Sequence, residues 1–396
     1  MHDIFASENN QSGPDSQQLQ REWDRFLQNI HRLEKSNRYE MTTLFENAYR
    51  LTPKSLPNPV LLGEKPIPLT LMAISHGDEV GGIQVLSTFL EKLLLTTTSD
   101  HLTFPIQIII GNPQAYAEQV RFIDQDLNRC FLYAPTKGQK RGTGPKGRHI
   151  EVARAKLIEE VLKETYFLLD LHQTQTPTQR PFMVLSHSPN SMKWAMTFRP
   201  PLSIVTSPKV KLVGTAKLKN ITATTLVQEN GGLAFTLEMG LKGLDPKQID
   251  LGLHWVEQSI QSVKKLIDKK MNSFDCAKEI SLEEIEQKWK DRIFQVVESM
   301  YCEQEQGDLD PGWENFRPTH KGQRIGLCGE KEIYAPVDAY MMFPKFKSGN
   351  TPVLKSPNDP ICKFINPLNC EEIFTLLNSY PPPAPAPTPE VNTPEH

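Results

Sequence analysis

The stretch IPLTLMAISHGDEVGGIQVLSTFLEKLLL, residues 67–95, decides the fold class of this chain. An apolar run of strand length (67–75) leads through the polar SHGDE (75–79) into a helical segment (81–95). A buried strand followed directly by a helix is the repeating unit of α/β domains. Further apolar strands recur at 104–111, 166–172, 182–187 and 233–240, with helical segments at 149–164 and 246–270. We therefore predict an α/β domain with a mostly parallel or mixed sheet flanked by helices.

The chain before this domain has a helical pattern. Apolar residues recur there at steps of three and four: Leu19, Trp23, Phe26, Leu27, Ile30 and Leu33. This spacing predicts an amphipathic helix over about 18–50, followed by a proline-containing linker at 51–59. We assign 1–56 to this N-terminal extension and linker. We expect the helix to pack on the domain behind it, and a dimer contact is the alternative.

The chain after this domain changes character twice. Short β-type segments separated by Gly, Pro and Asp predict a small β-rich domain at 276–378, so the α/β domain takes 57–275. Seven of the 32 prolines lie in the tail, 379–396, which predicts an extended or disordered segment. A polyproline ligand for an SH3-like domain is the alternative for the tail.

Composition excludes several classes of function. The 396 residues hold 44 Lys and Arg against 47 Asp and Glu, and a net charge of −3 gives no reason to expect nucleic acid or a membrane surface as partner. No apolar run approaches the ~20 residues of a membrane span. The opening MHDIFASENNQ has no secretory-signal pattern, so we expect a cytoplasmic protein. The six cysteines form no CxxC and are expected to be reduced thiols.

Two histidines and a glutamate follow two of the predicted strands. His76 and Glu79 stand three residues apart after the first strand, and His172 ends the strand YFLLDLH. Ligands of α/β folds bind at the carboxyl ends of strands, so neighbouring strands would bring these side chains together. Two His and one carboxylate are the ligands of a catalytic zinc site with one open position, whereas structural zinc sites use four ligands. Taken singly, each residue is as readily a capping or structural group.

Two further segments carry candidate chemistry. The segment 120–131 holds a group of polar side chains: Arg121, Asp124, Asp126, Asn128 and Arg129. Arginine suits bidentate binding of a carboxylate, and an aspartate beside a metal-binding histidine can accept its second ring proton. A solvated surface loop is the alternative. Glu238, at the end of the apolar strand LAFTLEMG, is either an ion-paired strand-end residue or a general base.

Four motifs in this order carry a resemblance. HGDE (76–79), RFIDQDLNR (121–129), LDLHQT (169–174) and LEMG (237–240) resemble the succinylglutamate desuccinylase/aspartoacylase family of zinc hydrolases. The resemblance implies a zinc carboxypeptidase-like (M14-type) fold with a small C-terminal β domain. It also implies one Zn²⁺ per subunit and a hydrolase that cleaves the amide bond of a small-molecule N-acyl amino acid.

The resemblance also implies a role for each site residue. The zinc ligands would be His76, Glu79 and His172. Glu238 would act as general base and then general acid, and Arg121 would polarise the carbonyl and stabilise the oxyanion. Asn128 and Arg129 would hold the carboxylate of the substrate, and Asp126 would orient a zinc-binding histidine, His76.

The sequence departs from the family pattern at two positions. The family usually has Asn where Asp78 stands, so a negative charge is added beside the ligands. In aspartoacylase-like members an arginine upstream of the general base reads the acyl carboxylate, but LVQENGG (226–232) offers Gln228. Arg180, in the loop after His172, is the arginine that could take its place.

Several features of the sequence allow more than one interpretation. GTGPKG (142–147) matches a dinucleotide fingerprint only in its glycines, because no strand precedes it. The basic segment 137–149 is either a solvated face or a lid that gathers anionic substrates. A carboxypeptidase-type peptide hydrolase and a catalytically silent metal-binding interaction protein are the alternative functions. The oligomeric state is open, with a homodimer among the options.

Overall fold

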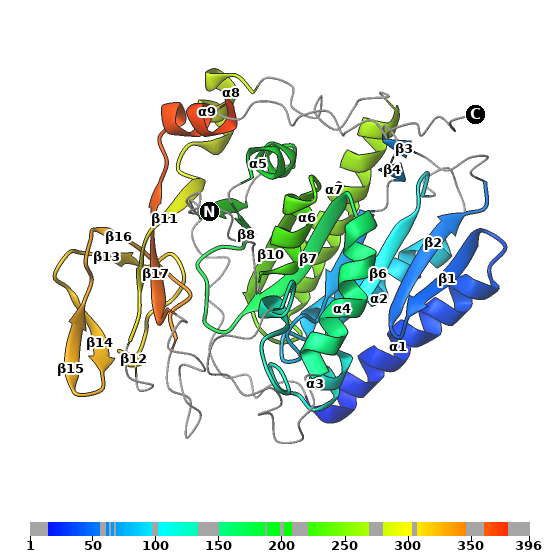
Figure 1. The fold of residues 1–396 in the computed structure, drawn as a ribbon, viewed down its shortest axis with the longest axis horizontal. Helices are drawn as coiled ribbons and strands as arrows, with labels where there is room; N and C mark the ends of the chain where they lie inside the picture. Colours follow the sequence, from blue (N-terminus) through cyan, green and yellow to red (C-terminus); the bar gives the residue numbers. More distant parts are fainter. Residues whose placement is uncertain are drawn as a thin grey trace, which may run out of the picture.

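The computed structural model describes residues 15–55, 61–62, 65–66, 69–96, 102–133, 150–186, 188–198, 202–207, 221–268, 280–302, 307–345 and 360–378. Its centre is one mixed sheet of twelve strands in the order β1-β2-β6-β5-β7-β10-β8-β9-β11-β17-β16-β13 (Figure 1). These strands are β1 (Tyr39–Phe45), β2 (Ala48–Pro53), β5 (Leu69–Ala73), β6 (Ile106–Ile110), β7 (Phe167–Thr174), β8 (Phe182–Leu185), β9 (Ser203–Thr206), β10 (Leu233–Leu241), β11 (Ile293–Met300), β13 (Pro318–Thr319), β16 (Ala339–Met342) and β17 (Cys362–Pro367).

Two small sheets and the helices complete the described fold. β3 (Leu61–Leu62) pairs with β4 (Lys65–Pro66), and β14 (Arg324–Cys328) lies between β12 (Gly307–Leu309) and β15 (Lys331–Tyr334). The helices are α1 (Ser16–Lys35), α2 (Gly81–Leu95), α3 (Pro113–Ala117), α4 (Ile150–Glu164), α5 (Pro189–Met196), α6 (Ala223–Glu229), α7 (Pro246–Asp268), α8 (Leu282–Trp289), α9 (Cys370–Asn378) and the 3₁₀ turn η1 (Leu127–Arg129). Within the ranges given above, no helix has the length and apolar character needed to cross a bilayer.

The predicted α/β core is confirmed. β6, β5, β7 and β10 are parallel neighbours, and every residue of β5, β6 and β7 is buried. Alternate side chains enter two cores: Leu169 and Leu171 pack with α2 and α7 on one face, and Leu168 packs with α4 and α6 on the other. Strands covered on both faces are largely apolar, which explains their hydrophobic runs.

The N-terminal prediction is right for its first half and wrong for its second. α1 ends at Lys35 and packs through Phe26, Ile30 and Leu33 into the core shared with α2. The residues expected to continue the helix form the hairpin β1–β2 instead, which adds two antiparallel strands beside β6. Ala48, Leu51 and Pro53 of β2 are buried, and Asn47 makes the turn with a φ of +58°. The first residues of the expected linker therefore belong to β2.

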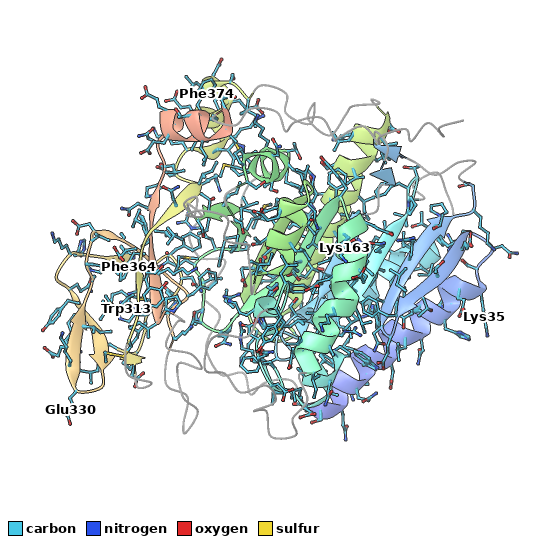
Figure 2. The ribbon with its side chains drawn as sticks, viewed as in Figure 1. Lys35, Lys163, Trp313, Glu330, Phe364 and Phe374 are labelled. Carbon is cyan, nitrogen blue, oxygen red and sulfur yellow. A yellow bond between two sulfur atoms is a disulfide. The ribbon has the colours of Figure 1, made fainter. Side chains whose placement is uncertain are left out.

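The C-terminal β region continues the central sheet. β11 pairs in parallel with β9, with Ile293 opposite Ile204, and β17, β16 and β13 follow it antiparallel. The small sheet β12-β14-β15 shares a separate core with these strands, in which Trp313 and Phe364 lie (Figure 2). The predicted β-rich character is thus present, and the division into domains at residue 276 stays a prediction.

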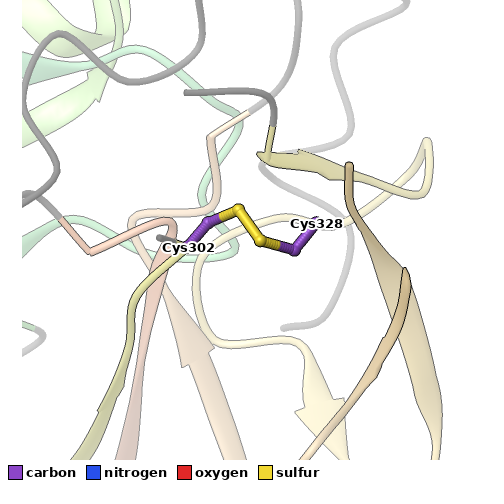
Figure 3. Close-up of a disulfide and its surroundings, with 2 residues drawn as sticks. All are labelled: Cys302 and Cys328. Atoms are coloured by element: carbon purple, nitrogen blue, oxygen red, sulfur yellow. A yellow bond between two sulfur atoms is a disulfide. The ribbon is translucent and has the colours of Figure 1, made fainter. Parts of the chain in front are cut away.

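The prediction of reduced cysteines is wrong for one pair. Cys302, after β11, forms a disulfide with Cys328 of β14, with a Cα–Cα distance of 5.7 Å (Figure 3). The two are 26 residues apart in sequence, so no local pattern signals that they meet. Cys130, Cys362 and Cys370 are free thiols. The basic segment 137–149 and the proline-rich tail lie outside the described residues.

Candidate functional site

The candidate metal ligands meet where β5 and β7 reach the same edge of the sheet. β5 ends at Ala73, and His76 and Glu79 follow in the turn before α2. His172 lies near the C-terminal end of β7, which is hydrogen-bonded to β5. The structure brings the three side chains together, as the strand pattern predicts.

Two backbone features fix the turn that carries His76. Ile74 has a φ of +59°, which is rare for a β-branched residue, and its carbonyl accepts a hydrogen bond from Asn112 N at 2.7 Å. At Gly77, a Cβ atom would lie 2.1 Å from the carbonyl carbon of Ala115. Only glycine therefore allows this turn to lie against the backbone of α3.

The polar atoms of the three side chains converge in a buried space. Glu79 Oε1 lies 2.7 Å from His76 Nδ1, and Glu79 Oε2 lies 2.8 Å from His172 Nδ1. One candidate ligand atom from each residue lies within 4.8 Å of the other two, and none of the three residues is more than 5% exposed. Burial raises the pKa of Glu79, but the charges of both histidines outweigh it and hold that pKa well below its usual range.

This donor set fits a metal ion. His76 Nδ1 is buried and has no hydrogen-bond partner among the described residues, although Glu79 lies beside it. A buried polar atom without a partner is costly, and a cation between the three side chains would satisfy it. Two imidazole nitrogens and a carboxylate, without cysteine, match the ligand set of catalytic zinc sites.

The second ring nitrogen of each histidine contacts a carboxylate. His76 Nε2 lies 3.1 Å from Asp126 Oδ1, and His172 Nε2 lies 2.9 Å from Asp170 Oδ2. Such contacts fix the tautomer and orientation of a metal-binding ring. Asp126 lies where the resemblance implies, whereas sequence reasoning missed Asp170. The sequence feature that could have identified Asp170 is the D-x-H spacing within β7, because alternate residues of a strand lie on the same face.

Glu238 lies on the strand next to His172. In the parallel pair β10–β7, Glu238 is directly opposite His172, so both side chains lie on one face of the sheet. The residue is 8% exposed, and its Oε2 has no hydrogen-bond partner among the described residues. Burial raises the pKa of Glu238 to about 7, and the negative charge of Glu79 acts in the same direction. The charge of His172 opposes this shift.

Arg121 contacts the candidate ligands directly. Its Nη1 donates to Glu79 Oε1 at 2.8 Å, and its Nη2 lies 2.9 Å from His76 Nε2. The loop that carries it is bound to the turn of the ligands, because Gly77 N donates to Arg121 O at 3.0 Å. About a quarter of the Arg121 side chain (24%) is exposed, so the guanidinium reaches the surface of the site.

Asn128 and Arg129 differ in their exposure. Asn128 is 6% exposed, with Nδ2 at 3.2 Å from His172 Nε2 and Oδ1 accepting from Ala223 N at 3.3 Å. Arg129 is exposed, and its Nη1 donates to Asn128 O at 2.8 Å. The amide of Asn128 therefore lies against His172, and Arg129 is an exposed residue next to it.

Two positions that depart from the family pattern have protein partners. Asp78 Oδ2 forms an ion pair of 2.7 Å with Lys242, which follows β10. This pair offsets the added negative charge, and sequence reasoning missed Lys242 because it lies 164 residues from Asp78. Gln228 Nε2 donates to Ala234 O at 2.7 Å and contacts Ser191 Oγ at 3.2 Å. Its amide is thus used in packing α6.

The chain is similar to known proteins over the region that holds these residues. Residues 67–262 match the family profile described as Succinylglutamate desuccinylase/Aspartoacylase catalytic domain. The chain is 29% identical over 132 residues to a probable aspartoacylase of Trichodesmium erythraeum, which is 32% of this chain and 42% of that protein. It is 31% identical over 112 residues to a succinylglutamate desuccinylase of Shewanella denitrificans, which is 28% and 30% of the two chains. These matches span less than half of either relative.

The fold is shared with solved structures. Succinylglutamate desuccinylase from Vibrio parahaemolyticus superposes with a TM-score of 0.56 at 15% identity, covering 84% of this chain and 89% of that one. At this identity the likeness concerns the fold, and it extends beyond the matched region into the β-rich C-terminal part. The catalytic region of this chain, residues 67–262, belongs to the succinylglutamate desuccinylase/aspartoacylase family.

Proposed function

We propose that this protein is a zinc-dependent hydrolase that cleaves the amide bond of an N-acyl amino acid. The observation that carries the proposal is the buried group of His76, Glu79 and His172 with Glu238 beside it on the next strand. Three such ligands leave a position open for water or substrate, as in catalytic zinc sites. The family of the catalytic region supports the same class of reaction.

The residues of the site supply the proton transfers. Zinc held by the three ligands would provide Lewis acidity, which polarises a carbonyl and lowers the pKa of water to about 7. Glu238 accepts a proton from the attacking water, and a pKa of about 7 suits a base that works near neutral pH. The C–N bond then breaks, and Glu238 returns the proton to the leaving nitrogen. The products are a carboxylic acid and an amino acid.

Charge that develops on the carbonyl oxygen needs a cation. Arg121 has five N–H donors, of which one bonds Glu79 and one faces His76 Nε2, so donors remain for an oxyanion. We assign the carboxylate of the amino acid to Arg129, which is exposed, with Asn128 beside it. A planar guanidinium suits a carboxylate because it can donate two parallel hydrogen bonds.

We propose Arg180 as the reader of the acyl group. Phe182 is opposite Glu238 in the antiparallel pair β8–β10, and Arg180 precedes it by two residues. The Arg180 guanidinium lies 5.0 Å from the ring centre of Phe316, which in turn packs on Phe182. These contacts support a position for Arg180 on the same face of the sheet as Glu238. Glu238, on β10, then lies between Arg180 and His172.

Metal analysis combined with a hydrolysis screen tests the function. We expect one zinc per chain and turnover of one or more N-acetyl, N-succinyl or N-formyl amino acids. His76→Ala should lose zinc and activity, whereas His254→Ala, an exposed histidine of α7, should keep both. A wild-type protein without zinc would contradict the proposal. Cleavage of peptides alone would indicate a peptide hydrolase, and zinc without any turnover would indicate a silent metal-binding protein.

The cytoplasmic location stays a prediction. The Cys302–Cys328 disulfide weighs against it, because cytosolic thiols are generally kept reduced.

A further inference from the structure

Glu151 is a fully buried carboxylate that the proposed reaction does not use. It lies in the first turn of α4, has no exposed surface and forms no ion pair with any side chain in the described parts of the chain. Its two oxygens accept hydrogen bonds from three consecutive backbone N–H groups: Ile123 at 2.6 Å, Asp124 at 3.0 Å and Gln125 at 3.3 Å. A buried carboxylate without a cation is tolerated only when such donors satisfy it.

The three N–H groups belong to the loop that carries Arg121 and Asp126. This loop is irregular between α3 and η1, so it lacks the hydrogen bonds of a helix or strand to hold its shape. The attachment is reciprocal, since Ile150 N at the start of α4 donates to Asp124 Oδ2 at 2.9 Å. The loop and the N-terminus of α4 are thus fastened to each other at several points.

Glu151 also reaches the turn of the metal ligands. Asn112 Nδ2 donates to Glu151 Oε1 at 3.1 Å, and Asn112 N donates to the carbonyl of Ile74 at 2.7 Å. Ile74 is the residue of positive φ that precedes His76. One buried side chain therefore joins two segments: the turn that supplies His76 and Glu79, and the loop that supplies Arg121 and Asp126.

We infer that Glu151 is a positioning residue that sets the distance between Arg121 and the metal ligands, acting through the backbone of residues 123–125. This inference rests on the proposed function. Arg121 must lie within hydrogen-bond reach of the developing oxyanion, and a displacement of about 1 Å in such a group lowers rates by about 100-fold. Glutamine in place of Glu151 keeps the shape but turns one acceptor into an NH₂ donor that faces backbone N–H groups.

The test is one double-mutant cycle with a matched control. Glu151→Gln should lower kcat by about 100-fold with KM within a few-fold and with zinc retained. In an Arg121→Ala background the same change should lower kcat by less than about threefold, because the group that Glu151 positions is already gone. Glu159→Gln is the control, since Glu159 lies on the same helix and accepts one backbone N–H, from Leu132, outside this loop.

Equal losses from Glu151→Gln in both backgrounds would show a merely structural role and overturn the inference, as would a kcat equal to that of Glu159→Gln. If Glu151→Gln does not fold, Asp124→Ala removes only the reciprocal bond to Ile150 and should give the same pattern at smaller amplitude.

Amide hydrogen exchange over 121–129 gives a readout that needs no turnover. It should accelerate in Glu151→Gln and not in Glu159→Gln. If exchange is unchanged, the inference is wrong whether or not the proposed function holds. If the protein also turns over N-acyl amino acids, the proposed function stands and only the inference is overturned.

Discussion

At the scale of single residues, burial of the Glu238 carboxyl is unfavourable for its charged form and raises its pKa into the range that the proposed reaction needs. Glu238 is an acid whose Oε2 has no partner among the described residues, and burial raises its pKa to about 7. A carboxyl whose pKa is raised on folding holds its proton more tightly in the folded state than in the unfolded one. It therefore reduces stability as pH rises from the unfolded value, about 4.3, through the folded one.

Glu238→Gln should therefore stabilise the metal-free protein at high pH. The gain should be close to zero at pH 4, grow between pH 4.5 and 7, and level off above pH 7 at roughly 3–4 kcal/mol. Denaturant unfolding of wild type and Glu238→Gln, both freed of metal with a chelator, measures this gain in stability across the pH range. A gain that is the same at pH 4.5 and pH 8 would show that packing, and not titration, is responsible.

The carboxylates behind the histidines give a second prediction at this scale. Asp170→Asn and Asp126→Asn should each weaken zinc binding about 10–100-fold, because the outer ring nitrogen loses its charged acceptor. The loss should be larger for Asp170, which is fully buried, than for Asp126, whose side chain is 23% exposed. Competition with a chelator of known affinity measures both constants. Unchanged affinity in Asp170→Asn would remove the role that we give this residue.

At the scale of elements, short segments between strands and helices build the site. The turn after β5 must approach α3 so closely that residue 77 has no room for a side chain. The loop after α3 is held to α4 by Glu151, and the turn and loop are joined by the bond from Gly77 N to Arg121 O. α3 and the N-terminus of α4 therefore support the segments that carry the candidate site.

Gly77→Ala tests the contact between the turn and α3. The added methyl group would overlap the backbone of Ala115, so the turn must move, and we expect weaker zinc binding and a loss of about 2–4 kcal/mol in stability. Thermal unfolding and zinc titration measure the two effects. The second change Ala115→Gly should not rescue the variant, because the overlap is with main-chain atoms. Full rescue would show that the contact is wrongly assigned.

At the scale of the whole molecule, the central sheet joins the catalytic region to the C-terminal β region. Pairing of β11 with β9 makes the two parts one sheet, and the Cys302–Cys328 disulfide attaches the small sheet β12-β14-β15 to the end of β11. The described fold thus places this covalent link far along the sheet from the candidate metal ligands, in a separate core.

Removal of the disulfide should lower stability and leave zinc binding intact. For the 26-residue separation, the chain-entropy model gives about 3–4 kcal/mol. The double variant Cys302→Ser/Cys328→Ser should unfold at a lower temperature than wild type, and a reductant should lower the Tm of wild type but not of the double variant. Cys370→Ser, which changes a free thiol, is the control. A Tm of the wild type that does not respond to reductant would contradict the prediction.

The sequence by itself determined the elements of the α/β core and the identities of its chemical groups. The apolar runs of β5, β6 and β7 are readable because burial on both faces favours hydrophobic residues at most positions. His76, Glu79 and His172 are predictable as a group because strand ends at one edge of a sheet are neighbours.

Only the tertiary structure decided which distant residues support that group. Glu151, Lys242 and the partner of Cys302 act across 26 or more residues, and the β1–β2 hairpin forms because β6 offers an edge for pairing. The local sequence pattern does not predict such contacts. Hydrogen bonds and ion pairs to a loop depend on where the folded chain brings their partners, whereas hydrophobic periodicity depends only on which face of an element is buried.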